Sequence, residues 1–457
     1  MMLDMPADSP ELHQGQHPDC AVCKLHKDFS MPDAIIKAAE QSNLVIFAGA
    51  GISTENPNVF YWNFYNEIKD ETGLKEDEEA SFPKVMSLFE ASKGKKELVQ
   101  RIKKRFDYVE AFPELYRRAV SFHRELSTLP FIREIITTNW DDYFEKECGA
   151  IPIVTDQDFA FWDLPQRKVF KIHGSVNNYG SIQATEDEYK KKYKQLRDGA
   201  IGANLKLSLA TKKLLFFGYS FQDEDFNRIY TALSKGLGSI KPTIYIISPN
   251  EKDPEKLRKF NAVGINTDGT FFLKKLKESF VKNKKIVPDE NFSHVLEALV
   301  KIQFEHAKIG SGSYILRKFP DTLYLSSYQD GIIHAFERID VKKKDGSYSC
   351  PHCVLNLIET YNRGIKEKRK QKLYHDIAYL EGYKIGLMYL LADERLRKVF
   401  PMYYLFGYGT ILKEKDYLKM RKDAEKIHKS AFKWAVGWIK YHKTSSDDTV
   451  FQHLPFA

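Results

Sequence analysis

The sequence predicts an α/β fold: a parallel sheet with a helical insertion, followed by a mostly α-helical C-terminal domain. Short, continuous apolar runs recur along the first 290 residues, and predicted helices separate them. After about residue 290, long stretches carry apolar residues at spacings of three and four, which is typical of helices. The 457 residues, of which 43% are hydrophobic and 29% charged, suffice for two globular domains.

The expected elements begin with a helix at residues 32–42, where Pro32 takes an early position that helices tolerate. A first apolar run, NLVIFA, follows and ends at glycines. Similar runs lie at residues 134–139, 168–172, 213–217 and 243–248. Because these runs are continuous rather than alternating, they predict strands that helices cover on both faces. The helices expected between them include residues 113–126 and 222–236, and this alternation predicts parallel pairing.

Two regions depart from the alternation. Residues 58–130 are too long for one crossover and contain aromatic and basic clusters, so we expect a helical insertion lying over the sheet. In the C-terminal part, residues 373–396 predict a long helix, and residues 341–353 predict a loop that carries two cysteines.

We expect three segments: an N-terminal extension (1–30), a sheet domain (31–290) and a helical domain (291–457). Residues 301–457 hold 28 Lys and Arg against 18 Asp and Glu, a net +10, so the total of +8 leaves −2 for the rest. A basic helical domain suits assembly or docking of an acidic protein or nucleic acid, or simply presents solvated helix faces. We find no apolar run that could span a bilayer and no basic, apolar signal region at the start, so we expect a cytoplasmic protein.

Glycines follow the first predicted strand, in the segment Gly49-Ala50-Gly51-Ile52-Ser53. Glycines at this position let the backbone approach a pyrophosphate, whose charge is met by amides at a helix N-terminus. Thr54 stands where the full dinucleotide fingerprint has a third glycine. Taken alone, the segment therefore also fits a glycine turn without a ligand.

Polar residues follow the other predicted strands. Asn139 and Asp141 end the second run, His173 follows the third, and Gly218 follows the fourth. The carboxyl ends of parallel strands line one edge of an open sheet, where ligands bind. An amide, a carboxylate, an imidazole and two glycine-bearing loops at one edge predict a nucleotide site.

Together these segments resemble sirtuins, which carry GAGIS-type, T-x-N-x-D, HG and G-x-S segments in this order along a Rossmann-like sheet. Here they are GAGIS (49–53), TNWD (138–141), HGS (173–175) and GYS (218–220), and the resemblance covers roughly residues 32–290. It implies NAD binding and a catalytic set of Asn139, Asp141 and His173. The residues that it implies for holding NAD are Gly49, Ala50, Gly51, Ser53, Gly218, Ser220 and, at the adenosine ribose, Asn250.

Two departures from protein-deacylating sirtuins stand out. No cysteine lies between His173 and Gly218, where those sirtuins insert a four-cysteine zinc module, and ENPNVFYW replaces the P-D-F-R segment. The chain looks more like bacterial sirtuin-like effectors of anti-phage defence, which degrade NAD. That resemblance implies an NAD hydrolase that releases ADP-ribose and nicotinamide with water as acceptor. It also implies control by a homo-oligomer, by a partner such as an ATPase, or by another activator.

Three alternatives remain open. The first is a sensor that binds NAD or a derived nucleotide without turnover, and the second is an NAD-dependent protein deacylase. A dehydrogenase is the least favoured, because it would want the third glycine and an acid closing the second strand. The joint presence of Asn139, Asp141 and His173 favours an enzyme over a sensor.

Four cysteines fall in two pairs, Cys20/Cys23 and Cys350/Cys353, and the fifth, Cys148, is expected to be a buried apolar residue. The two-residue spacing lets one turn offer two thiolates to a metal, and four thiolates would form a closed structural zinc site. Such a site would join the N-terminal extension to the helical domain. Four reduced cysteines without metal fit the sequence equally well.

Overall fold

The computed structural model describes residues 23–402, except residues 57, 61, 76–77, 220–226, 228–229, 232–241, 250–259 and 311–322, together with four single residues beyond 402. The chain divides into two compact units, Met1–Ser279 and Phe280–Ala457. Cys20, Ser220 and Asn250 lie outside the described residues, as does most of the helix expected at 222–236.

A seven-stranded parallel sheet forms the centre of the first unit, with the order β3-β4-β2-β1-β5-β6-β7. The strands are β1 (Leu44–Ala48), β2 (Glu134–Thr137), β3 (Ile151–Ile153), β4 (Lys168–Lys171), β5 (Lys213–Phe217), β6 (Ile244–Ile247) and β7 (Ala262–Ile265). The predicted Rossmann-like sheet is confirmed. From β1 the chain adds strands on one side through β2 and on the other through β5, so the topological switch point lies between β1 and β5.

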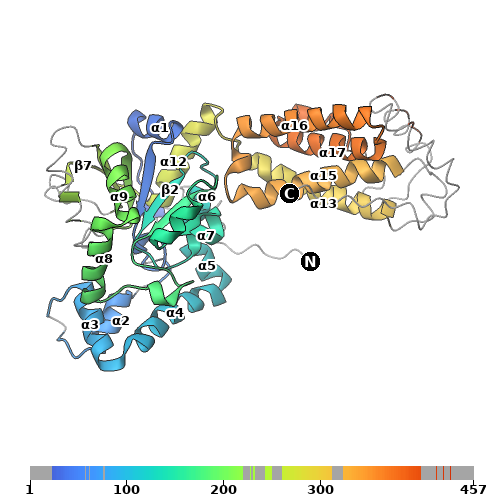
Figure 1. The fold of residues 1–457 in the computed structure, drawn as a ribbon. Helices are drawn as coiled ribbons and strands as arrows, with labels where there is room; N and C mark the ends of the chain where they lie inside the picture. The colour runs from blue at the N-terminus through green and yellow to red at the C-terminus, as the bar shows by residue number, and fades with distance from the viewer. Residues whose placement is uncertain are drawn as a thin grey trace. The chain divides into compact units, whose positions relative to one another are not determined.

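Helices cover both faces of this sheet, because its central strands are apolar on both faces. On one face, Phe47 and Phe216 stack at 4.8 Å and pack with Leu205 of α9 (Ala200–Thr211). On the other face, Phe217 packs against Phe122 of α6 (Ser121–Ser127) and against Phe272 of α12 (Gly269–Lys282). Figure 1 shows α9 and α12 on opposite sides of β1.

The predicted helical insertion is confirmed, but most of it lies elsewhere than expected. It comprises α2 (Phe64–Lys69), α3 (Phe82–Lys93), α4 (Lys95–Ala111), α5 (Pro113–Ala119) and α6. α6 packs on a face of the sheet, whereas α2, α3 and α4 lie beyond the carboxyl ends of the strands (Figure 1). Their apolar side chains form a separate core with Tyr143 and Ile182, which follow β2 and β4. The insertion therefore packs against the loops that carry the predicted site.

Among the described residues, the first unit also contains α1 (Asp33–Glu40), α7 (Tyr143–Cys148) and α8 (Glu186–Asp198). Residues 25–29 of the N-terminal extension pack against the start of α12. There, Phe29 stacks on Phe272 at 5.3 Å, and the Asp268 amide donates to the Leu25 carbonyl at 3.0 Å. Cys148 is buried in α7, as predicted, and its burial raises the pKa of its thiol to about 12.

The second unit is helical in its described part, as predicted. The α-helices described there are α13 (Asp289–Gly310), α15 (Leu323–Lys343), α16 (Pro351–Lys370), α17 (Tyr374–Leu391) and α18 (Glu394–Arg397). The loop expected at 341–353 is shorter than predicted, because α16 begins at Pro351 and so includes Cys353. Among the residues described, no helix is both long and apolar enough to cross a membrane.

Candidate functional site

The glycine loop after β1 packs against the end of β5. The Gly49 amide donates to the Phe217 carbonyl at 2.9 Å, and the Gly51 amide donates to the Gly218 carbonyl at 3.1 Å. A Cβ atom on Gly49 would lie 2.4 Å from the Gly218 oxygen, and Gly218 itself has φ +56°. Both positions therefore require glycine, and the loop lies at the topological switch point where nucleotides bind in such sheets.

Asn139 joins this loop to the end of β2. Its Nδ2 donates to the Gly49 carbonyl at 3.2 Å and lies 3.4 Å from Ser53 Oγ, and its own amide donates to Thr137 Oγ1 at 3.0 Å. The side chain is buried. No hydrogen-bond partner for its Oδ1 occurs within the described part of the chain. A buried acceptor that the protein leaves unsatisfied is available to a ligand hydroxyl or a water.

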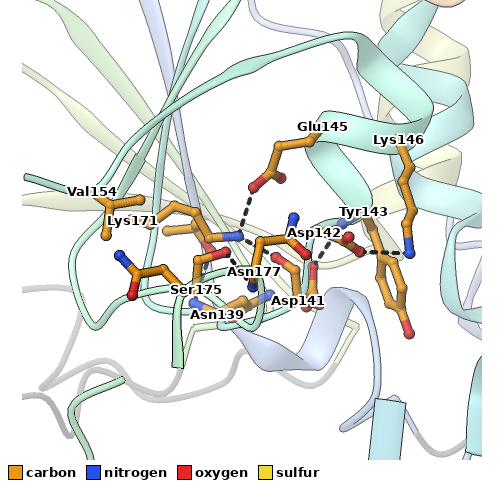
Figure 2. Close-up of polar contacts among 12 residues, drawn as sticks. Asn139, Asp141, Asp142, Tyr143, Glu145, Lys146, Val154, Lys171, Ser175 and Asn177 are labelled. Carbon is orange, nitrogen blue, oxygen red and sulfur yellow. Dashed lines mark hydrogen bonds and ion pairs between the residues drawn. The ribbon is translucent and has the colours of Figure 1, made fainter. Parts of the chain in front are cut away.

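Asp141 is held by groups from three strand ends. Its Oδ2 accepts from Ser53 Oγ at 3.0 Å, its Oδ1 accepts from the Tyr143 amide at 3.3 Å, and its carbonyl accepts from Lys171 Nζ. Figure 2 shows Lys171 between Asp141 and Glu145, whose Oε1 lies 3.0 Å from Nζ. Burial raises the pKa of Asp141, and the Lys171 charge and the Ser53 hydroxyl oppose this rise.

His173 follows β4 and is buried. Its ring stacks on that of Tyr189 in α8, with centroids 4.4 Å apart and planes 1° from parallel. Its carbonyl accepts from Trp140 Nε1 at 3.0 Å, which connects it to the loop of Asn139. Gly174 turns the chain at φ +92°, where a Cβ would lie 2.1 Å from the Ser181 oxygen.

The structure thus brings most predicted site residues to one edge of the sheet. Hydrogen bonds connect Gly49, Ser53, Asn139 and Asp141 directly, and Trp140 links them to His173. Ala50 and Gly51 form the short 3-10 turn that Gly49 precedes, and Gly218 contacts this turn.

Of the predicted zinc ligands, Cys350 directly precedes α16 and Cys353 lies in its first turn. The Cys23 side chain, like Cys20, lies outside the description. Among the residues that are described, no three His, Cys, Asp or Glu side chains form a group that could hold a metal. The zinc site therefore stays a prediction.

Three residues of the site were not predicted: Trp140, Lys171 and Tyr189. Lys171 was counted within an apolar run, although a lysine that ends a fully buried strand needs a polar partner. The need for a polar partner could therefore have indicated Lys171 from the sequence. Nothing in the sequence pairs Tyr189 with His173, because the two lie on different elements.

Residues 133–267 match the SIR2-like domain family. The match runs from the start of β2 to the end of β7 and includes Asn139, Asp141 and His173. The chain therefore carries a SIR2-like domain, and the predicted resemblance to sirtuins is confirmed.

The chain is also similar to proteins named NAD(+) hydrolase ThsA. It is 30% identical over 241 residues to one from Cytobacillus dafuensis, with 49% of this chain and 47% of the relative covered. It is 27% identical over 263 residues to one from Acinetobacter baumannii (strain 532279), with 56% and 51% covered. For one from Bacillus cereus (strain MSX-D12) the values are 25% over 292 residues, with 61% and 56% covered. The chain thus spans about half the length of these relatives.

Proposed function

We propose that the protein hydrolyses NAD to ADP-ribose and nicotinamide. One observation carries the proposal. Asn139 is hydrogen-bonded to the glycine loop at Gly49, and a hydrogen bond from Trp140 in the same segment reaches the His173 carbonyl. A nucleotide-binding loop, a buried acceptor and an imidazole therefore share one strand edge. The SIR2-like match and the names of the relatives point to the same substrate.

The glycosidic bond between ribose and nicotinamide breaks through a transition state with positive charge on the ribose. A site that speeds this step orients the ribose, places one water at the anomeric carbon and accepts a proton. We assign the orienting role to the Asn139 amide, because its oxygen is buried and its nitrogen is fixed by Gly49. We assign the proton acceptor role to His173, and the support of Asn139 through Ser53 to Asp141.

Water is the expected acceptor rather than an acyl-lysine. The interval between His173 and Gly218 holds α8 and α9 and contains no cysteine, so the zinc module of protein deacylases has no counterpart there. A sensor without turnover remains the second candidate function. Within the described residues, the buried Asn139 amide oxygen has no hydrogen-bond partner, and its place at the same edge as a buried imidazole favours hydrolysis over simple binding.

The wider role is proposed on the sequence resemblance. We propose a cytoplasmic anti-phage effector that depletes NAD when a homo-oligomer, a partner protein such as an ATPase, or another activator switches it on. We also propose that the helical unit serves assembly or docking, and that Cys20, Cys23, Cys350 and Cys353 hold one structural zinc.

The test is the release of nicotinamide from NAD by the purified full chain, alone and with the product of a neighbouring gene. We expect His173→Ala and Asn139→Ala each to lower the rate about 10²–10⁴-fold. His294→Ala is the matched control, because His294 is a partly exposed histidine on α13. Wild-type turnover in His173→Ala would overturn the catalytic assignment.

A further inference from the structure

Lys171 is a fully buried lysine that the proposed reaction does not yet use. It is the last residue of β4, and its side chain has 0% exposure. Its Nζ donates to the carbonyl of Asp141 and lies 3.0 Å from Glu145 Oε1 (Figure 2). Burying an ammonium group is costly unless it is paired and hydrogen-bonded, so this position is occupied by lysine for its polar contacts rather than for apolar packing.

The position of Lys171 in the chain connects the two residues assigned to catalysis. It lies two residues before His173, and the carbonyl that it binds lies two residues after Asn139. A second hydrogen bond runs in the opposite direction, from Trp140 Nε1 to the His173 carbonyl at 3.0 Å. The two loops are therefore cross-linked by one side chain from each loop, and the Val176 amide also donates to the Trp140 carbonyl at 2.8 Å.

Asp141 extends this connection to the glycine loop. The carboxylate of Asp141 accepts from Ser53, while its carbonyl accepts from Lys171. A shift of the Asp141 backbone would consequently move Ser53, and through it the Asn139 amide, which lies 3.4 Å from Ser53 Oγ.

We infer that Lys171 is a positioning residue that fixes the distance between Asn139 and His173. The inference rests on the proposed function, since it assumes that these two groups act together on NAD. Lys171 itself touches no reacting atom in this account. Its removal should reduce kcat, because a misplacement of about 1 Å lowers an enzyme rate on the order of 10²-fold.

Lys168 provides a matched control on the same strand. It is the first residue of β4, is 5% exposed, and its Nζ donates to the carbonyls of Leu164 and Gln166, the latter at 2.8 Å. Lys168→Met and Lys171→Met thus remove the same group from the two ends of one strand. If Lys171 had a purely structural role, the two variants should change kcat and thermal stability alike.

The experiment compares kcat, KM and thermal stability of the two variants in the full chain, with rates expressed per folded molecule. We expect Lys171→Met to lower kcat on the order of 10²-fold and Lys168→Met to leave kcat unchanged, although both lower the melting temperature. Wild-type kcat in Lys171→Met, or an equal loss in Lys168→Met, overturns the inference. If Lys171→Met does not fold, Lys171→Met with Glu145→Gln replaces it, because that pair leaves no buried carboxylate without its partner.

A second measurement does not depend on turnover. The five tryptophans are labelled as 5-fluorotryptophan, and the resonance of Trp140 is assigned with Trp140→Phe. We expect Lys171→Met, and not Lys168→Met, to shift or broaden the Trp140 resonance. A wild-type chain without NAD turnover, both alone and with the product of the neighbouring gene, would refute the proposed function. The inference would then be tested by this resonance alone.

Discussion

A methyl group added at Gly49 should disturb the site without straining the local backbone. Gly49 has φ −107° and ψ 176°, values that any residue adopts, so Gly49→Ala carries no conformational penalty. Its Cβ would however lie 2.4 Å from the Gly218 oxygen and 2.8 Å from the Tyr219 Cα. Both are backbone atoms, which cannot rotate away.

The size of the effect follows from these distances. Real Cβ contacts are essentially never under 3.0 Å, so the glycine loop must move at least 0.6 Å away from β5. Because the Gly49 carbonyl accepts from Asn139 Nδ2 at 3.2 Å, the shift reaches the proposed catalytic amide. We expect kcat/KM for NAD to fall about 10- to 100-fold and the fold to lose about 1–3 kcal/mol from overpacking.

Gly94→Ala separates crowding from backbone strain. Gly94 has φ +87° and ψ 158° with nothing within 4 Å of its added Cβ, so alanine there strains the backbone by about 1–3 kcal/mol without a clash. Nicotinamide release by chromatography, with melting curves for both variants, gives the comparison. Our reasoning would be refuted if Gly49→Ala kept the wild-type kcat/KM, or if Gly94→Ala lost as much activity.

Three further predictions concern pH, specificity and metal. Burial, with a contribution from the Lys171 charge, lowers the pKa of His123 to about 3. Between this value and the ordinary histidine pKa, His123 is therefore neutral in the folded state and protonated in the unfolded state. Stability should fall as pH drops from about 6.5 towards 3, and His123→Phe should flatten this loss in denaturant titrations; an unchanged slope argues against it. NAD-dependent deacetylation of acetyl-lysine peptides should be negligible, and robust deacetylation would contradict the assignment of water as acceptor. Elemental analysis should find one zinc per chain that Cys350→Ser with Cys353→Ser removes, and zinc-free wild-type protein would end that proposal.

Most of the sheet could be predicted because its central strands are buried on both faces. For this reason β1 and β5 consist almost entirely of apolar residues. The two edge strands were missed. β3 has three residues and contains Pro152, and β7 has four residues and contains Gly264. Both are therefore short, and each includes a residue that is unfavourable inside a strand.

The site was predictable where a residue's place on a strand determines its role. Asn139 and His173 follow from the rule that carboxyl ends of parallel strands meet. Lys171 and Tyr189 act through partners on other elements, and one sequence does not reveal such pairs. The start of α16 was missed although Pro351 is a signal for a first helical position.

The most direct test of the central claim is the product balance from NAD. The purified chain, alone and with its partner gene product, is incubated with NAD, and nicotinamide, ADP-ribose and remaining NAD are quantified together. We predict that nicotinamide and ADP-ribose appear in equal amounts as NAD disappears, and that His173→Ala stops both. NAD recovered intact, although bound by the chain under every condition, would contradict hydrolysis and identify the site as a sensor.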